Sequence, residues 1–368
     1  MKEIKSIINA YKKIDFSTTK AALVTIVGIQ GSSYRRTGAR MLVLCNGTYF
    51  GGISGGCLEG DALRRAQKAM FKNKPSIITY DTTQEDNSEV GVGLGCNGII
   101  DVLITPLHND EEDPVHLLAA ISEIREPRVL VCIIECKETL GLQGKTILLE
   151  SDEQFFSSFP VTDISVPVLK DAKNALENKT SETITYDTLE GSIKIFIEVI
   201  VPPIHLIIYG SNYDILPAAT IGRELGWNVT VVMNIAKASK LLLETATHII
   251  DNKSGQEPVI DDHTAIVLMA HDYKTDLNNF KKALQTEASY IGLLGPRKRS
   301  EKMYAELLNE NIKLSEACME RIYAPCGLDI GAENPEEIAL SIAAEIRAHF
   351  ANRKGMSLKY RQGTIYNN

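Results

Sequence analysis

The stretch that follows Val201-Pro202-Pro203 constrains the fold more than any other part of the chain. Residues 204–209 form an apolar, strand-like run, a glycine turn follows, residues 213–225 have a helical pattern, and residues 228–233 form a second apolar run. This order is the opening strand–helix–strand unit of a doubly wound parallel sheet. Further strand-like runs alternate with helical segments, at 248–250, 265–270, 290–294 and 321–324. We therefore expect a C-terminal Rossmann-like domain over residues 202–351.

The last helix of this domain carries a complete set of start signals. Asn334 is suited to cap it, Pro335 to take its first position, and Glu337 to complete a capping box. Apolar residues then recur every four positions from Ile338, which places them on one helical stripe. Residues 352–368 contain four basic residues and no acidic one. We expect this basic tail to be mobile or to act as an interaction arm.

Residues 1–201 predict an N-terminal mixed α/β domain. Asn46-Gly47 is a dipeptide typical of a two-residue hairpin turn, and it separates strand-like runs at 39–45 and 48–50. Helices are expected near 2–14 and 58–72, and further strands at 21–29, 76–80, 99–106, 129–135 and 192–201. The fold class is therefore α/β, with the mixed domain followed by the Rossmann-like doubly wound parallel sheet.

Length and composition set the broad class of protein. The 368 residues are enough for two domains, and 44% hydrophobic with 23% charged residues is a globular composition. The longest unbroken apolar runs have six residues, as at 129–134, whereas a membrane-spanning helix needs about 20. The first residues also lack the apolar core and the cleavage site of a secretory signal. We expect a cytoplasmic protein that does not engage a membrane.

The net charge and the cysteine content limit the classes of binding partner and site that this chain is expected to have. A net charge of −8, from 39 basic and 47 acidic residues, argues against a general nucleic-acid binder. The seven cysteines are widely spread without a CxxC spacing, which argues against a disulfide framework or a zinc finger and fits a reducing compartment. Cys132 and Cys136 have the even spacing of one strand face, and we expect them, like Cys45 and Cys318, to be packing residues.

Two glycine-rich loops hold the other cysteines of interest. Cys57 ends the run Gly55-Gly56-Cys57 directly before a predicted helix, and Cys96 lies in Gly93-Leu94-Gly95-Cys96-Asn97-Gly98. The positive end of a helix and free backbone amides favour a thiolate, which suits a nucleophile or a ligand of a soft metal. If the two loops meet, the pair is able to hold a thiophilic metal or to pass on a sulfur atom. The alternative is that each cysteine is a small buried residue in a tight turn.

Basic and acidic residues gather at predicted loop ends. Arg35, Arg36 and Arg40 flank a Gly-Ser-Ser loop, and Arg297-Lys298-Arg299 begins a predicted helix. Both sets suit a phosphate group, although a solvated surface is the alternative. His271-Asp272 and Asp329 follow predicted parallel strands, whose carboxyl ends form the ligand edge of such sheets.

The Rossmann turn itself departs from the dinucleotide-binding pattern. That pattern needs three glycines in the turn and an acidic residue at the end of the second strand. Here Gly210 alone remains of the glycines, Asn212 and Ile215 replace the others, and Met233 occupies the place of the acid. These changes argue against NAD(P), and they leave open that the segment only maintains the fold.

Taken together, several blocks resemble the xanthine dehydrogenase accessory factor family (XdhC/CoxI). They are Gly31-Ser32-Ser33, the stretch 38–43, the glycine loop 51–61, the loop 93–98, His271-Asp272, and the stretches 290–295 and 327–332. They occur in the family's order and cover almost the whole chain. The resemblance implies a chaperone for the molybdenum cofactor, a pterin with a dithiolene, a phosphate and a bound molybdenum. Such a protein is an accessory factor rather than a catalyst.

The resemblance also implies partners and contact residues. The cofactor is expected as bound cargo, which is protected while a cofactor sulfurase installs its terminal sulfur. The accessory factor, expected to be a homodimer, then delivers the cofactor to a xanthine dehydrogenase-type molybdenum hydroxylase apoenzyme. Cys57 and Cys96 are expected at the metal or its sulfur, and Arg297 with Arg299 at the phosphate. The full set of expected cofactor-binding residues is Arg36, Gly55, Gly56, Cys57, Glu59, Gly95, Cys96, Gly210, His271, Asp272, Arg297, Arg299 and Asp329.

Two departures from the family pattern keep other functions open. The family turn is usually G-A-G-H and an Asp commonly closes the second strand, whereas this chain has Gly210-Ser211-Asn212-Tyr213 and Met233. One alternative is an NAD(P)-dependent oxidoreductase. The other is a scaffold for apoenzyme assembly that binds no small molecule.

Overall fold

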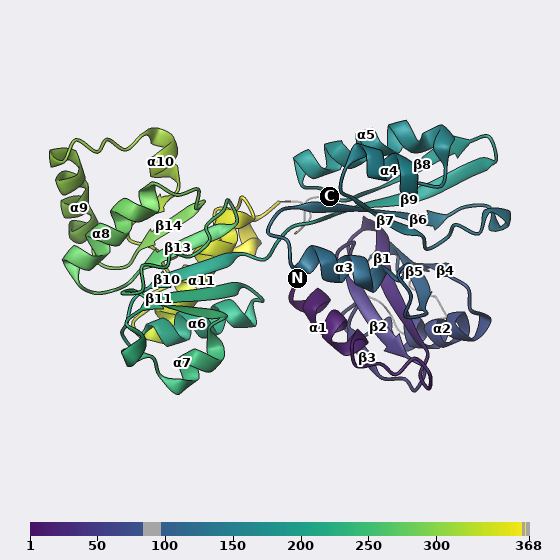
Figure 1. Ribbon diagram of the computed structural model, residues 1–368, viewed down its shortest axis with the longest axis horizontal. Helices are drawn as coiled ribbons and strands as arrows, with labels where there is room; N and C mark the ends of the chain where they lie inside the picture. The colour runs from purple at the N-terminus through teal and green to yellow at the C-terminus, as the bar shows by residue number, and fades with distance from the viewer. Residues whose placement is uncertain (84–96, 363–364, 366–368) are drawn as a thin grey trace. The chain divides into compact units, whose positions relative to one another are not determined.

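The chain divides into two compact units, Met1–Pro202 (unit 1) and Pro203–Asn368 (unit 2). The structure is a computed structural model that describes residues 1–83, 97–362 and 365. Figure 1 shows that each unit has its own sheets and helices. The fold class predicted from the sequence, a mixed α/β region followed by a doubly wound parallel sheet, is confirmed.

Unit 1 is built on two antiparallel sheets. The first has the order β3-β2-β1-β5-β4 and the second the order β7-β6-β9-β8. The strands are β1 Ala21–Gly31, β2 Arg40–Leu44, β3 Tyr49–Gly51, β4 Ser76–Asp81, β5 Gly98–Leu107, β6 Arg128–Glu135, β7 Thr146–Leu149, β8 Glu182–Thr188 and β9 Gly191–Ile200. The helices are α1 Lys2–Tyr11, α2 Glu59–Lys72, α3 Pro114–Ser122, α4 Asp152–Ser158 and α5 Ser165–Asn178.

Alternation along the strands divides the apolar residues of unit 1 among several cores. On β1, Ala22, Val24 and Ile26 face α2 in one core, whereas Ala21 and Leu23 join α1 and α3 in another. Helices α4 and α5 cover one face of the second sheet. Between the two sheets, residues of β1, β5, β6 and β9 form a small core of Val27, Leu103, Cys132, Ile134 and Phe196.

One buried ion pair joins the two sheets. Arg40 of β2 and Glu198 of β9 make a two-pronged contact, with 2.8 Å between Arg40 Nη1 and Glu198 Oε1, and their side chains are 5% and 7% exposed. Arg40 Nη1 also donates to the Gly38 carbonyl at 2.7 Å. Gly38 has a φ of +82°, and a Cβ there would lie 2.5 Å from Glu198 Oε1. Glycine is therefore required where the chain passes this pair.

We expect loss of either partner of this pair to destabilise unit 1 by about 3–5 kcal/mol, because the remaining charge stays buried without its counterion. The variants are Arg40→Met and Glu198→Gln, followed by urea unfolding. The double variant Arg40→Met/Glu198→Leu should recover most of the loss, since it leaves no buried charge. Glu138→Gln removes the exposed contact between Lys74 and Glu138 and should leave stability unchanged. Equal losses in single and double variants would contradict the prediction.

Several local expectations for unit 1 are confirmed and others are wrong. The hairpin forms at Asn46-Gly47, with β2 and β3 paired antiparallel and Gly47 at φ +90°. Cys45 is exposed rather than packed. Cys132 is buried between the sheets, and burial raises the pKa of its thiol to about 11. Cys136 lies instead toward the α5 side, because a register shift in β6 between Ile133 and Glu135 breaks the alternation.

The segment 128–201 contains more structure than the sequence pattern predicted. Helices α4 and α5 form there, along with strands β7 and β8, in place of polar turns. The buried positions of α5 include Val168, Leu169, Ala172 and Ala175, a helical spacing that a proline at position 167 in the first turn obscures.

Unit 2 has a six-stranded sheet in which all neighbours are parallel, in the order β12-β11-β10-β13-β14-β15. In chain order within the unit this is 3-2-1-4-5-6, the order of Rossmann folds. The strands are β10 His205–Tyr209, β11 Asn228–Met233, β12 His248–Asp251, β13 Thr264–Leu268, β14 Tyr290–Leu293 and β15 Ile322–Tyr323. The helices are α6 Ile215–Glu224, α7 Lys240–Thr245, α8 Tyr273–Leu284, α9 Arg297–Asn309, α10 Glu316–Glu320 and α11 Pro335–Phe350.

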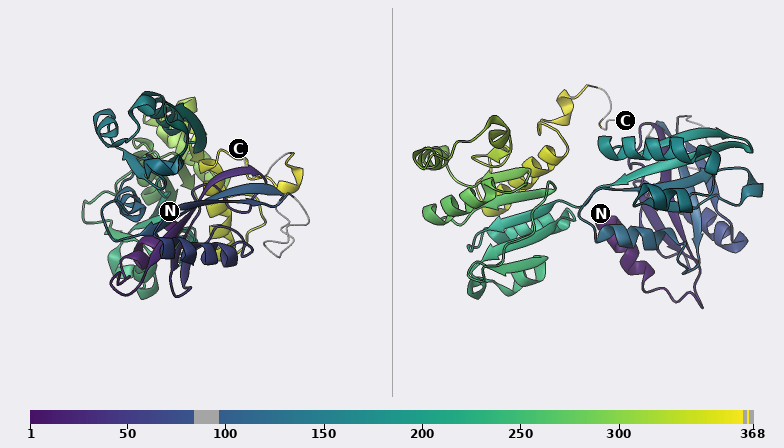
Figure 2. Two further views of the ribbon diagram at one scale, coloured as in Figure 1. Left: turned by 90° about the vertical axis from the view of Figure 1, so that its right-hand side faces the viewer. Right: turned by 45° about the horizontal axis from the view of Figure 1, so that its top comes forward.

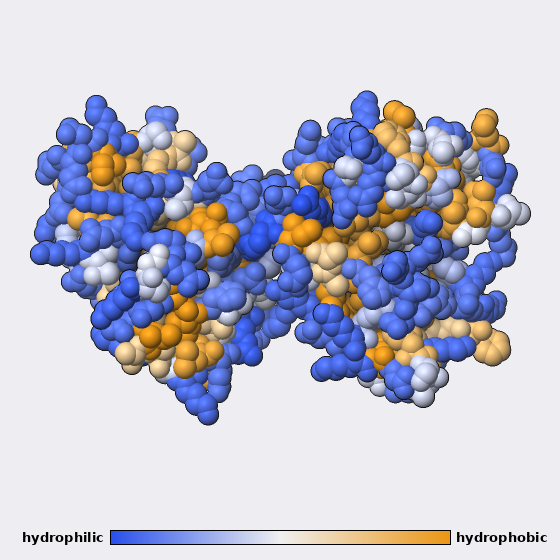
Figure 3. Space-filling model, in the orientation of Figure 1, coloured by the Kyte–Doolittle hydropathy of each residue, from blue (hydrophilic) through white to orange (hydrophobic). Residues whose placement is uncertain are grey.

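Helices cover both faces of this sheet (Figure 2). Helices α6, α7 and α11 pack on one face and α8 and α9 on the other, each over its own apolar core. The capping box of α11 is present as predicted, with Asn334 Oδ1 accepting from the Glu337 amide at 2.9 Å. Not all apolar surface is covered: Figure 3 shows hydrophobic residues gathered over α6 and α7, where Leu225, Leu241 and Leu243 are about half exposed.

Across the described residues, no helix has both the length and the apolar character needed to cross a membrane.

Candidate functional site

The parallel sheet of unit 2 reverses its winding between β10 and β13, which pair directly. In such sheets, ligands bind outside the carboxyl ends of the strands at the reversal point. We call the loops that follow these two strands, residues 210–214 and 269–272, the switch edge. Among the predicted residues, Gly210, His271 and Asp272 lie here.

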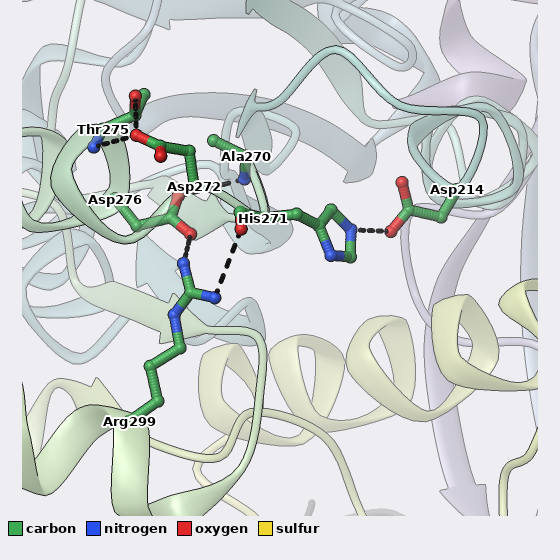
Figure 4. Close-up of polar contacts among 7 residues, drawn as sticks. All are labelled: Asp214, Ala270, His271, Asp272, Thr275, Asp276 and Arg299. Carbon is green, nitrogen blue, oxygen red and sulfur yellow. Dashed lines mark hydrogen bonds and ion pairs between the residues drawn. The ribbon is translucent and has the colours of Figure 1, made fainter.

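An imidazole and a carboxylate meet across the switch edge. His271 Nε2 lies 2.6 Å from Asp214 Oδ2, although the two residues are 57 positions apart. His271 is 49% exposed and Asp214 13%. Figure 4 shows the His271 ring pointing toward Asp214 and away from Arg299. His271 also has a φ of +61°, a left-handed backbone that is uncommon outside glycine.

A second ion pair lies beside it. Arg299 Nη2, near the start of α9, lies 2.6 Å from Asp276 Oδ2, and Arg299 Nη1 donates weakly to the His271 carbonyl at 3.5 Å. Asp276 Oδ1 accepts from the Ala270 amide at 3.0 Å. Burial raises the pKa of Asp276, while the Ala270 amide and the Arg299 guanidinium act in the opposite direction. The pair thus fixes the loop that carries His271.

Asp272 serves as the cap of α8. Its Oδ2 accepts from the Thr275 amide at 2.8 Å and from the Thr275 hydroxyl at 2.6 Å. These bonds lower the pKa of Asp272, so it is a carboxylate at neutral pH. Asp272 is exposed, and its second oxygen faces away from the cap (Figure 4).

The other predicted residues of unit 2 lie at neighbouring strand ends. Gly210 is buried, and a Cβ there would lie 2.8 Å from the Met269 carbonyl oxygen, so the first glycine of the turn keeps its close-approach role. Arg297 is exposed at the first position of α9, and Asp329 is exposed in the loop after β15. A cavity of about 10 Å³ beside Arg299 has room for one water molecule at most. A ligand larger than a water molecule does not fit in this cavity.

Asp214 and Asp276 were not among the residues predicted from the sequence. Asp214 stands directly before α6, four positions after Gly210, and Asp276 stands four positions after Asp272. The sequence did contain one signal for Asp214, because a carboxylate within the Rossmann turn is itself an indication of a functional residue. The partner of each residue comes from another strand end, which the sequence alone does not specify.

In unit 1, the predicted loop residues form one built structure, the Gly-Cys loop of residues 51–58. The Glu59 carboxylate accepts from the Ile53 amide at 3.1 Å, the Ser54 amide at 2.7 Å and the Ser54 hydroxyl. Ser54 Oγ in turn accepts from the amides of Gly56 and Leu58, at 3.1 and 3.0 Å. Burial alone would raise the pKa of Glu59, but the Ser54 and Ile53 donors outweigh it and lower that pKa.

This network leaves Gly55 and Gly56 exposed and Cys57 half-buried, directly before the cap residue of α2. Part of Cys57 packs against the core under α2. Arg36, on the neighbouring loop, is half-buried, and its carbonyl accepts from the Ala39 amide at 3.1 Å. Gly95 and Cys96 lie outside the described residues. Within the described part of the chain, no three His, Cys, Asp or Glu side chains are placed to hold a metal ion.

We expect Glu59→Gln to lower the stability of unit 1 by about 1.5–3 kcal/mol, because a carboxylate that accepts several bonds is replaced by a neutral amide. Since folding lowers the pKa of Glu59, its contribution is full above the unfolded-state pKa and is lost as pH falls through the folded-state value. Wild type should therefore lose its advantage over the variant in acid. Thermal unfolding from pH 3 to 7 measures this, with the exposed Glu111→Gln as control. A pH-independent difference would contradict the assignment.

Comparison with known proteins places this geometry in a family. A family model described as XdhC and CoxI family matches residues 17–81, and one described as XdhC Rossmann domain matches residues 206–346. A Bacillus subtilis protein, named as one of the subunits of a probable xanthine dehydrogenase, is 29% identical over 89% of this chain and 92% of its own length. The Escherichia coli molybdenum cofactor insertion chaperone PaoD is 25% identical over 89% of this chain and 82% of its own length.

A solved structure agrees with these matches. A crystal structure described as a xanthine dehydrogenase from Bacillus halodurans superposes with a TM-score of 0.74 at 27% identity, covering 96% of this chain and 97% of that one. The likenesses extend over both units. The sequence motifs, the two-unit fold and these matches agree, and the chain belongs to the XdhC and CoxI family, with the XdhC Rossmann domain as its unit 2.

Proposed function

We propose that this protein is an accessory factor in molybdenum cofactor maturation, which binds the cofactor as cargo and delivers it to a xanthine dehydrogenase-type molybdenum hydroxylase. The observation that carries the proposal is the similarity to the cofactor insertion chaperone PaoD over 89% of this chain, which extends over both units. The likeness to the Bacillus subtilis protein named for xanthine dehydrogenase, over a similar span, supports the client class.

In unit 1, Cys57 is the proposed contact with the molybdenum or its sulfur. A thiol suits this soft ligand set, and Cys57 lies directly before Leu58, the cap residue of α2. The neighbouring Gly56 is exposed, and nothing lies within 4 Å of the place where its Cβ would be, which leaves room for a ligand there. Glu59 acts through the loop that it folds, because Ile53 and Ser54 occupy its carboxylate oxygens. It is a positioning residue in this proposal.

In unit 2, Arg297 is the proposed phosphate contact. It is exposed at the first position of α9, where backbone amides and a guanidinium both favour an anion. Arg299 holds the switch edge together through Asp276, so its proposed role is to position rather than to bind. His271 and Asp272 remain proposed contacts of the same edge, and the exposed Asp329 a further one.

The proposed partners are the apoenzyme that receives the cofactor and a sulfurase that completes it. We also propose a homodimer as the working form, for which the half-exposed Leu225, Leu241 and Leu243 over α6 and α7 offer apolar contact area. The proposed compartment is the cytoplasm.

Cofactor retention tests the carrier role. The protein is incubated anaerobically with freshly released molybdenum cofactor and desalted, and the retained pterin is quantified by fluorescence after oxidation. Wild type should retain close to one pterin per chain. A folded wild type that retains none would contradict the carrier function and favour a scaffold that binds no small molecule.

The same measurement tests the thiol. Cys57→Ala should reduce retention several-fold, because the soft ligand is lost. Cys45→Ala is the matched control, since Cys45 is an exposed thiol of the same unit. Equal retention by Cys57→Ala and Cys45→Ala would refute the role of Cys57 while leaving the carrier function intact.

A further inference from the structure

Three unfavourable features coincide at the switch edge. His271 has the left-handed backbone, at φ +61°. Among the described residues, four buried side-chain polar atoms are without a hydrogen-bond partner, and two of them, Asp214 Oδ1 and Arg299 Nε, belong to this group. Strain and unsatisfied polar atoms that gather in one place of a fold point to a functional constraint there.

The fold of the loop does not require the contact between His271 and Asp214. The connection from β13 to α8 is fastened by Asp272, which caps α8 through Thr275, and by Asp276, which binds the Ala270 amide and Arg299. The His271 side chain itself is half exposed, so it contributes little to the core. The contact with Asp214 therefore needs another explanation.

The location of the contact between Asp214 and His271 supplies an explanation. In dinucleotide-binding Rossmann domains, the pyrophosphate lies against the start of the helix that follows the first strand. In unit 2 this helix is α6, and the residue directly before it is Asp214. A carboxylate with its own imidazole partner therefore stands at the helix start against which the ligand's negative charge would lie. Gly210 still keeps the close approach of the first glycine, whereas Asn212 and Ile215 replace the other two glycines of the binding pattern.

We propose that Asp214 and His271 form a latch across the switch edge that excludes pyrophosphate-containing ligands from unit 2. Asp214 supplies the excluding charge, because an incoming pyrophosphate meets a like charge at the helix start. His271 holds that carboxylate in place across the edge, at 2.6 Å. The latch makes Asp214 a specificity-determining residue of a sheet that otherwise has the complete Rossmann order. This inference is independent of cofactor carriage.

Calorimetric titration of the full chain with inorganic pyrophosphate, and separately with ADP-ribose, tests the latch. Wild type should bind both weakly or not at all. Asp214→Asn should bind pyrophosphate at least about tenfold more tightly, because removing the like charge relieves the repulsion. Pyrophosphate tests the charge alone, and ADP-ribose tests whether the adenosine half fits as well.

Asp262→Asn is the matched control. Asp262 contacts His263 at 2.8 Å just before β13, so it belongs to a second carboxylate–imidazole pair of the same unit, away from the carboxyl ends of the strands. It should leave pyrophosphate affinity unchanged. His271→Asn keeps the excluding carboxylate and should show no gain in pyrophosphate affinity. This variant therefore separates the effect of the Asp214 charge from the effect of breaking the contact across the edge.

Two outcomes would overturn the latch. One is an Asp214→Asn variant, folded by circular dichroism, that binds pyrophosphate no more tightly than Asp262→Asn. The other is a wild type that already binds pyrophosphate as tightly as Asp214→Asn does. Asp214→Ser, which also removes the charge and suits the start of a helix, repeats the test should the asparagine variant fail to fold. Cofactor retention by these variants is measured separately, so failure of the latch and failure of the carrier function remain distinct results.

Discussion

The buried pair of Arg40 and Glu198 is the interaction on which the rest of unit 1 depends. It links β2 of one sheet to β9 of the other, and residues of both sheets also pack together in two apolar cores. The backbone of Arg40 also makes two hydrogen bonds. Its amide donates to the Glu3 carboxylate of α1 at 3.0 Å, and its carbonyl accepts from the Gly52 amide at 2.9 Å. One residue therefore joins both sheets, the first helix and the start of the Gly-Cys loop.

Unit 2 positions its polar residues by a different principle. A parallel sheet places all its carboxyl ends at one edge, so loops from distant parts of the sequence become neighbours. Residues after β10, β13 and β14 thus meet at the switch edge, as in the contacts of His271 with Asp214 and of Arg299 with Asp276. The contact of Arg299 with Asp276 holds its loop in place, and the half-exposed His271 shows that the edge is open to solvent. Such an edge is suited to a ligand that binds on the surface.

Several residues that sequence analysis assigned to a ligand have polar atoms engaged in building the loops. Glu59 folds the Gly-Cys loop, Asp272 caps α8, and Arg299 pairs with Asp276. The sequence does not separate the two roles, because the residue types that bind anions and metals are also those that satisfy helix ends and buried amides. The structure separates them by showing which oxygen and nitrogen atoms are already occupied. Contact with a ligand by these residues stays a prediction.

The sequence by itself determined the fold class and many, but not all, of the local elements; α4, α5, β7 and β8 were missed. Strand-length apolar runs, the Asn46-Gly47 turn and the capping box at Asn334 and Glu337 are properties of short segments, and they form as predicted. Tertiary structure alone decided the pairings. Asp214 meets His271 across 57 positions, and Arg40 meets Glu198 across 158. Many charged residues are equally eligible partners in the sequence, and burial together with sheet order selects among them. The same holds for the register shift in β6, which turns Cys136 away from Cys132. Such contacts depend on the path of the whole chain rather than on a local pattern.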